Sequence, residues 1–111
     1  MNLNLSGHHV DISAALRDYV ESKVKPIERH VDRLIDATVV LTVDNLAHRA
    51  DGTLRVAGAT LHATASRPDM YAAIDTLMSK LDEQARRHRE RRHDQAIRQN
   101  ARPADAKRSL P

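Results

Sequence analysis

The spacing of the apolar residues changes along the chain, and this pattern constrains the fold more than any other feature of the sequence. From Leu16 to Val31 the apolar residues recur every three or four positions, which is the period of one helical face. Residues 36–44, DATVVLTVD, alternate between apolar and polar, which is the period of a half-buried strand. The helical period returns from Met70 to Ala85. The pattern therefore predicts two amphipathic helices separated by sheet.

Three shorter alternating runs complete the expected sheet. Residues 2–6, NLNLS, place two leucines on one face and predict a short first strand. Residues 53–57 and 60–65 also alternate, and the short turn at Gly58-Ala59 between them predicts a hairpin. Residues 45–52 are polar, and we expect a loop there.

The order of these elements, β-α-β-β-β-α, defines the fold class. A length of 111 residues fits one domain. Two amphipathic helices bury the single apolar face of a sheet most simply when both lie on that face. We therefore predict an α+β fold, a single two-layer domain with a four-stranded sheet and both helices packed on one face. The core must be aliphatic, because the chain has two Tyr and no Phe or Trp.

Capping residues predict where the helices begin and end. Ser13 precedes the first helical run and is a good N-cap. Pro26 removes a backbone donor, so we expect a kink or break just before it and a last turn that reaches about Val31. Ser66 and Asp69 have the spacing of a capping box at the start of the second helix.

The last third of the chain is rich in arginine. Residues 85–93 read ARRHRERRH, in which five of nine residues are arginine and only one is acidic. At ~100° per residue, a stripe about 80° wide along the second helix holds cations and amides but no acid. This basic stripe consists of Lys80, Gln84, Arg87, Arg91, Gln95 and Arg98.

Beyond Ala85, basic residues also enter the helical sector that carried the core. His88, Arg92 and, at its edge, Arg89 stand where leucine and isoleucine stood before. Because an apolar core does not accept these side chains, we expect the helix to project beyond the sheet. An isolated helical end is marginal in water unless something binds it.

Charge is divided unevenly between the two parts of the chain. Residues 1–78 hold 8 Lys/Arg and 10 Asp/Glu, a net charge of −2, whereas residues 79–111 hold 10 and 5, a net charge of +5. The composition alone fits either a solvated C-terminus or a polyanion partner. Five arginines in seven positions exceed what a helix dipole requires. Because the planar fork of arginine binds two phosphate oxygens, the pattern favours nucleic acid as the partner.

Other classes of protein find less support in the sequence. The chain has no Cys and no apolar run near the ~18 residues of a membrane helix, and its N-terminus does not resemble a secretory signal. Seven histidines are spread over separate elements, and His88 and His93 diverge on the helical wheel. We therefore expect no enzyme, no metal site, no cofactor and no membrane partner.

Several segments resemble the short ribosome hibernation promoting factors of bacteria. These segments are NLNLSG, VDISAALRDYVESK, ATVVLTV, LHATA and, above all, DMYAAIDTLMSKLDEQ. The resemblance covers roughly residues 1–93 and implies a layout like that of double-stranded-RNA-binding domains. Pro26 is a departure, because the family helix usually continues there. The resemblance implies a ribosome-binding domain over 1–93, and we expect a flexible basic tail over 94–111.

The resemblance also implies a function. Such factors bind the small ribosomal subunit near the decoding centre, block the mRNA and tRNA sites, and help a second small factor to pair ribosomes into inactive dimers in stationary phase. We accordingly expect a cytoplasmic protein that is a monomer in isolation. The basic residues that match family positions, and would face ribosomal RNA, are Lys23, Lys80, Arg87, Arg89 and Arg91. Charge and wheel position add Lys25, Arg29, Arg86 and Arg92.

Two alternatives share some of these features. A general double-stranded-RNA binder would have a similar fold and a similar basic helix, since duplex RNA is read through phosphates and 2′-hydroxyls. A protein-interaction adaptor would use the wet face of the sheet or the tail. A protein that binds the assembled small subunit but not a plain RNA duplex is not a general double-stranded-RNA binder. Binding that weakens little as salt rises would indicate a protein-interaction adaptor.

Overall fold

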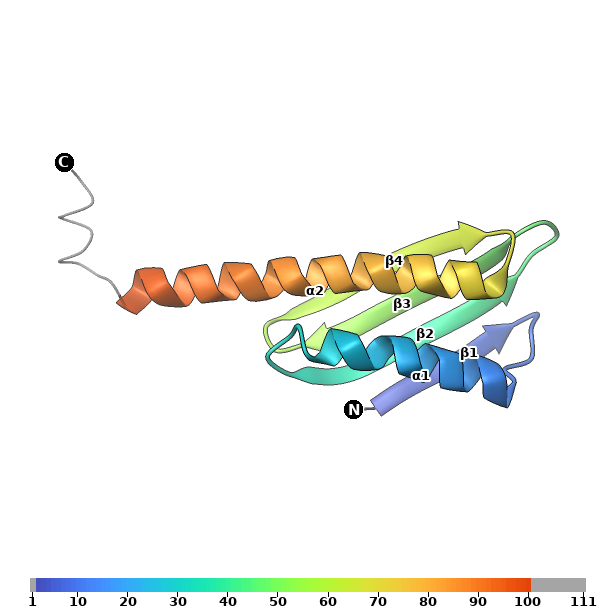
Figure 1. The fold of residues 1–111 in the computed structure, drawn as a ribbon, viewed down its shortest axis with the longest axis horizontal. Helices are drawn as coiled ribbons and strands as arrows, with labels where there is room; N and C mark the ends of the chain where they lie inside the picture. The colour runs from blue at the N-terminus through green and yellow to red at the C-terminus, as the bar shows by residue number, and fades with distance from the viewer. Residues whose placement is uncertain (1, 101–111) are drawn as a thin grey trace.

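A computed structural model describes the backbone of residues 2–100 and the side chains of residues 2–91 (Figure 1). It confirms the predicted α+β fold and the order of its elements. Those elements are β1 (Asn2–His8), α1 (Ala14–Glu28), β2 (Leu34–Val43), β3 (His48–Val56), β4 (Ala59–Arg67) and α2 (Met70–Asn100).

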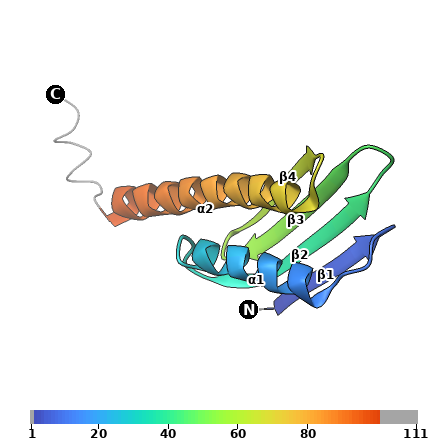
Figure 2. The same ribbon diagram turned by 45° about the vertical axis from the view of Figure 1, so that its right-hand side comes forward.

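The four strands form one sheet in the order β1-β2-β3-β4. β1 runs parallel to β2, and the other two pairs are antiparallel. The predicted β3–β4 hairpin is present, but its turn is Ala57-Gly58 rather than Gly58-Ala59, and Gly58 adopts a φ of 86° that favours glycine. Both helices cover the same face of the sheet, with α2 over β3 and β4 (Figure 2).

The core between helices and sheet is aliphatic, as predicted. Its largest fully buried side chains include Ile27 from α1, Leu41 and Leu54 from the sheet, and Leu77 and Leu81 from α2. Each such side chain contributes about 1.5–3 kcal/mol when it leaves water. None of the described side chains in this core is polar or charged.

The first helix begins as predicted but does not end as predicted. The Ser13 side chain accepts a hydrogen bond of 3.1 Å from the backbone nitrogen of Leu16, which confirms the N-cap. The expected break before Pro26 is wrong, because α1 continues to Glu28. Only one backbone donor is lost near the end of the helix, and the next residue, Ile27, is fully buried.

The capping box expected for the second helix is also wrong. Ser66 belongs to β4, where it pairs with Arg49 of β3. Asp69 caps the helix alone, with its side chain accepting a hydrogen bond of 3.0 Å from the backbone nitrogen of Ala72. The strand pairing extends past Ser66 and thereby removes it from the helix end.

The loop expected over residues 45–52 is largely a strand. β3 begins at His48, and a tight turn closes between Asp44 and Ala47 through two backbone hydrogen bonds. Ala50 and Gly52 face the core there, so the alternation is present but its inner residues are small. A Cβ built on Gly52 would lie 2.9 Å from Leu81 Cδ1, which shows how closely α2 packs on this strand.

α2 extends well past the sheet (Figure 1). Among its described side chains, which end at Arg91, the last buried one is Ala85, and its backbone stays helical to Asn100. Fifteen residues of helix therefore follow the core, which corresponds to about 22 Å. The helix thus includes residues 94–100 of the expected tail, and residues 101–111 lie outside the described part of the chain.

Candidate nucleic-acid interface

The described arginines that follow Ala85 are exposed to solvent. The side chains of Arg86, Arg87 and Arg89 are 61%, 66% and 56% exposed, and Arg91 is also exposed. None of the described side chains of α2 after Ala85 is buried, so these cations lie on a helix segment beyond the apolar core. The Arg92 side chain lies outside the described residues.

The first half of the basic stripe lies along the outer edge of the sheet. Lys80 Nζ donates a hydrogen bond of 2.8 Å to the backbone oxygen of Thr64, and Gln84 Nε2 donates one of 2.8 Å to that of His62. β4 is an edge strand, so these side chains occupy carbonyl oxygens that would otherwise be open to pairing. The stripe therefore runs along the β4 flank of α2.

Further along the same stripe, the arginines are available to a partner. Arg87 forms an ion pair of 2.5 Å with Glu83, one helical turn before it, and both side chains are more than half exposed. Such a surface pair contributes about 0.3–0.5 kcal/mol and is easily exchanged for another anion. Arg91 follows four residues after Arg87, so it lies on the same flank of α2.

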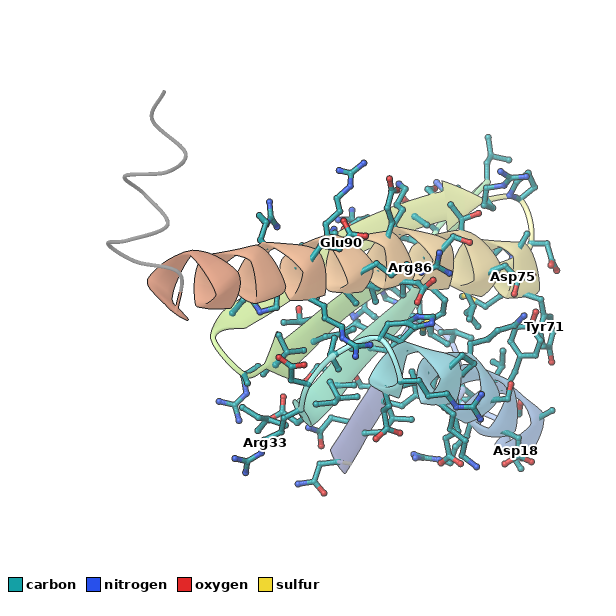
Figure 3. The ribbon with its side chains drawn as sticks, turned by 60° about the vertical axis from the view of Figure 1, so that its left-hand side comes forward. Asp18, Arg33, Tyr71, Asp75, Arg86 and Glu90 are labelled. Carbon is teal, nitrogen blue, oxygen red and sulfur yellow. The ribbon has the colours of Figure 1, made fainter. Side chains whose placement is uncertain are left out.

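The opposite flank of α2 carries acids that face α1. Asp75 accepts a hydrogen bond from Tyr19 and pairs with Lys23 Nζ at 3.4 Å. Asp82 contacts His30 and also pairs with Arg86 at 2.8 Å. Tyr71 and Asp75 lie at the start of α2 above α1, and Arg86 follows about three turns later (Figure 3).

Two consequences follow from the contact between the helices. The hydrogen bond to Asp75, with desolvation, raises the pKa of Tyr19 to about 12. Tyr19 also packs edge-on against Tyr71, with ring centroids 4.8 Å apart. Lys23 lies within this contact, so it does not continue the basic stripe on the β4 flank.

Two residues at the end of the core contact the rest of the domain through backbone oxygens. His88 Nε2 donates a hydrogen bond of 3.1 Å to the oxygen of Ala57, in the β3–β4 turn. Arg89 Nη1 donates one of 3.3 Å to the oxygen of Arg29, which caps α1, and Arg89 Nε lies 3.9 Å from Asp32. After Ala85, the side of α2 that faced the core therefore contacts the rest of the domain through hydrogen bonds of His88 and Arg89.

The predicted site residues thus form two groups rather than one patch. Lys80, Arg87 and Arg91 lie on the β4 flank, whereas Lys23, Arg86 and Arg89 contact acids or carbonyls on the α1 flank. Lys25 and Arg29 are exposed near the end of α1. Among the described side chains, those of Lys25, Arg29 and Arg91 make no hydrogen bond or ion pair within the described part of the chain.

Sequence reasoning placed Asp82 beside Arg86 along α2, as observed, but missed the contact of the acids with α1. Asp75, Asp82 and Arg89 are spaced seven residues apart, so they lie on one face of the helix. That face meets α1 through Tyr19, His30 and the backbone of Arg29. The seven-residue spacing is the signal that could have identified this contact.

The open face of the sheet holds paired charges. Arg55 and Asp36 form an ion pair across β3 and β2, and their hydrogen bond lowers the pKa of Asp36. Arg49 pairs with Asp51, which also accepts a hydrogen bond of 2.7 Å from Thr64. Because these charges neutralise each other, the open face offers a polyanion less than α2 does.

Metal sites and membrane spans are two other kinds of functional feature. The described residues contain no group of three or more His, Cys, Asp or Glu side chains placed to hold a metal ion. None of the helices in the described part of the chain is long and apolar enough to cross a membrane.

The fold and the site define a class of protein: a small β-α-β-β-β-α domain whose last helix carries exposed arginines past the sheet. The model of the family described as "Sigma 54 modulation protein / S30EA ribosomal protein" matches residues 3–93. The match covers most of the chain, and the protein belongs to this family.

Related sequences cover nearly the same length. The chain is 46% identical over 106 residues to the ribosome hibernation promoting factor of Azotobacter vinelandii, covering 96% of this chain and 97% of that protein. It is 43% identical over 91 residues to the factor of the same name from Escherichia coli K12, covering 82% and 96%. These relatives support the resemblance found in the sequence.

Solved structures share the fold. The N-terminal domain of Protein Y from Thermus thermophilus superposes with a TM-score of 0.75 at 34% identity, covering 79% of this chain and 99% of that one. A ribosomal subunit interface protein from Coxiella burnetii gives a TM-score of 0.72 at 30% identity, covering 81% and 99%.

Proposed function

We propose that this protein binds the small ribosomal subunit near the decoding centre, blocks the mRNA and tRNA sites, and promotes ribosome hibernation by dimerisation in stationary phase. Membership of a family whose relatives are named ribosome hibernation promoting factors supports this proposal. The observation that carries it is the end of α2, where exposed arginines extend past the core.

The chemistry of this helix end suits ribosomal RNA. Arginine binds phosphate through two parallel hydrogen bonds, and each neutralised phosphate releases counterions. The binding of such a helix therefore weakens steeply as salt rises. The relatives are regulatory factors, and we propose that this protein also inhibits by occupying space rather than by catalysis.

The described contacts rank the nine candidate residues. The side chains of Lys25, Arg29 and Arg91 are exposed and make no hydrogen bond or ion pair with the described residues, and those of Arg86 and Arg87 make surface pairs within α2. We propose these five as the main contacts with ribosomal RNA. Lys23, Lys80 and Arg89 already contact other elements of the domain, so they contribute less directly. Arg92 remains a proposed contact whose side chain lies outside the described residues.

The remaining expectations belong to the same proposal. Residues 1–93 form the ribosome-binding domain, and residues 94–111 act as a basic tail. The protein works in the cytoplasm, where ribosomes are found. It is a monomer in isolation, and a second small hibernation factor acts with it when ribosomes pair.

Co-sedimentation with purified small subunits, beside a plain RNA duplex, tests the proposal. We expect pelleting with subunits at near-physiological salt and much weaker binding to the duplex. Equal affinity for both, lost at the same salt concentration, would instead identify a general double-stranded-RNA-binding module. Bound protein should also reduce the binding of tRNA to the subunits, because the proposed site overlaps that of tRNA.

A further inference from the structure

Two described residues of α2 connect its exposed end to the rest of the domain. Among the described side chains of α2, Ala85 is the last buried one, and none of those from Arg86 to Arg91 is buried. In the next turn, His88 and Arg89 make hydrogen bonds to elements other than α2, and Arg89 also pairs with Asp32. These two residues, which we call the collar, lie where the helix passes the end of the sheet.

The two collar residues attach α2 to two different elements of the domain. His88 reaches the β3–β4 turn, where Ala57 is followed by Gly58 with its φ of 86°. Because the partner is a carbonyl oxygen, Nε2 of His88 must carry the proton in this contact. This contact fixes α2 relative to the sheet.

Arg89, the next residue along α2, reaches the end of α1. The Arg29 oxygen that it contacts belongs to the C-cap of α1, where backbone carbonyls carry partial negative charge. A guanidinium is well suited to such a group, and Asp32 beside it adds a second attraction at 3.9 Å. This contact fixes α2 relative to the neighbouring helix.

We propose that His88 and Arg89 are positioning residues that set the direction of the exposed end of α2, and that this direction determines how well the arginines match their RNA. The inference rests on the proposed function and assigns a separate task to two residues of the same segment. From residue 89 to residue 100 the helix extends about 16 Å, so a swing of roughly 15° displaces its end by about 4 Å. Such a displacement exceeds the length of a hydrogen bond.

Holding the exposed end of α2 in one direction should also raise its affinity for RNA. A helix end that is already aimed loses less freedom when it binds than one that swings. His88 and Arg89 would therefore strengthen binding without adding a phosphate contact of their own.

Distance measurements between two spin labels test the collar directly. The chain has no Cys, so cysteines introduced at Asp18 on α1 and Gln95 on α2 are labelled uniquely. We expect one narrow distance distribution for the parent and for His88→Gln, whose amide can still donate. His88→Ala and Arg89→Ala should broaden the distribution, while Arg91→Ala, two residues beyond the collar, should leave it narrow.

Binding to small subunits provides the second readout. His88→Ala changes no fixed charge, so we expect about fivefold weaker binding with an unchanged salt dependence, and recovery in His88→Gln. Arg91→Ala should instead reduce the slope of the logarithmic salt plot by about one unit. A narrow distance distribution in both His88→Ala and Arg89→Ala would overturn the collar.

The two proposals fail in different ways. A parent protein that does not bind small subunits contradicts the proposed function, yet the distance distributions still decide whether the collar aims the helix. The collar variants could instead show broad distance distributions and still bind small subunits as well as the parent. That result would overturn the claim that the direction of α2 determines how well its arginines match their RNA.

Discussion

Lys80 donates a hydrogen bond of 2.8 Å to the backbone oxygen of Thr64, so a lysine of the basic stripe protects the open edge of the sheet. Gln84 does the same for His62, one turn later on α2. The first part of the stripe thus contacts the sheet, whereas Arg87 and Arg91, beyond Ala85, are exposed and are proposed to bind RNA.

Removing both edge contacts should destabilise the domain. In Lys80→Ala/Gln84→Ala, two hydrogen bonds from side chains to β4 are lost, and we expect the free energy of unfolding to fall by about 1–3 kcal/mol. Urea denaturation measures this change, and Ser79→Ala on the exposed side of α2 is the control. Stability equal to the parent's would show that these contacts do not hold α2 on the sheet.

The contact between Tyr19 and Asp75 predicts a change of stability with pH. The pKa of Tyr19 rises from 10.0 to about 12 in the folded protein, so the folded state keeps this proton when the unfolded state has lost it. The stabilisation is complete below pH 10 and disappears as the pH rises toward 12. In Tyr71→Phe, Tyr19 is the sole phenol, and its absorbance can be titrated directly. Adding Asp75→Asn should lower the measured pKa, and an unchanged value would contradict this assignment.

The close packing of α2 on β3 predicts a cost for any side chain at residue 52. In Gly52→Ala, the new Cβ would lie 2.9 Å from Leu81 Cδ1 and 3.1 Å from Leu77 Cδ2, so we expect a loss of about 1–3 kcal/mol. A double-mutant cycle in urea with Leu81→Ala checks the cause. The two losses should be less than additive, because the smaller side chain removes the clash. If the two losses of stability were fully additive, a clash with Leu81 would not be the cause of the loss in Gly52→Ala.

The fold was predictable where apolar residues are large. The helical faces of Leu16 to Ile27 and of Met70 to Ala85 were found from their spacing, and the structure buries both. The first half of β3 was missed, since its inward residues are Ala50 and Gly52, which give little hydropathy signal. Their spacing of two before Leu54 continues the alternation and could have revealed the strand.

The candidate site was predictable in composition but not in its contacts. The wheel located the arginines of α2, and the structure leaves Arg86, Arg87, Arg89 and Arg91 exposed. It did not show that Arg89 reaches the backbone of residue 29, because that contact joins residues 60 positions apart. Such contacts depend on how the helices cross the sheet, which local periodicity does not specify.

The central claim is that the exposed arginines of α2 bind ribosomal RNA. Its most direct test is the affinity of Arg87→Glu/Arg91→Glu for purified small subunits at near-physiological salt. Arg17→Glu/Arg67→Glu is the matched control, with the same charge change on exposed residues away from the end of α2. We predict that the first variant folds normally and loses binding, whereas the control binds nearly as well as the parent. Parental affinity in the α2 variant, or an equal loss in both, would contradict the claim.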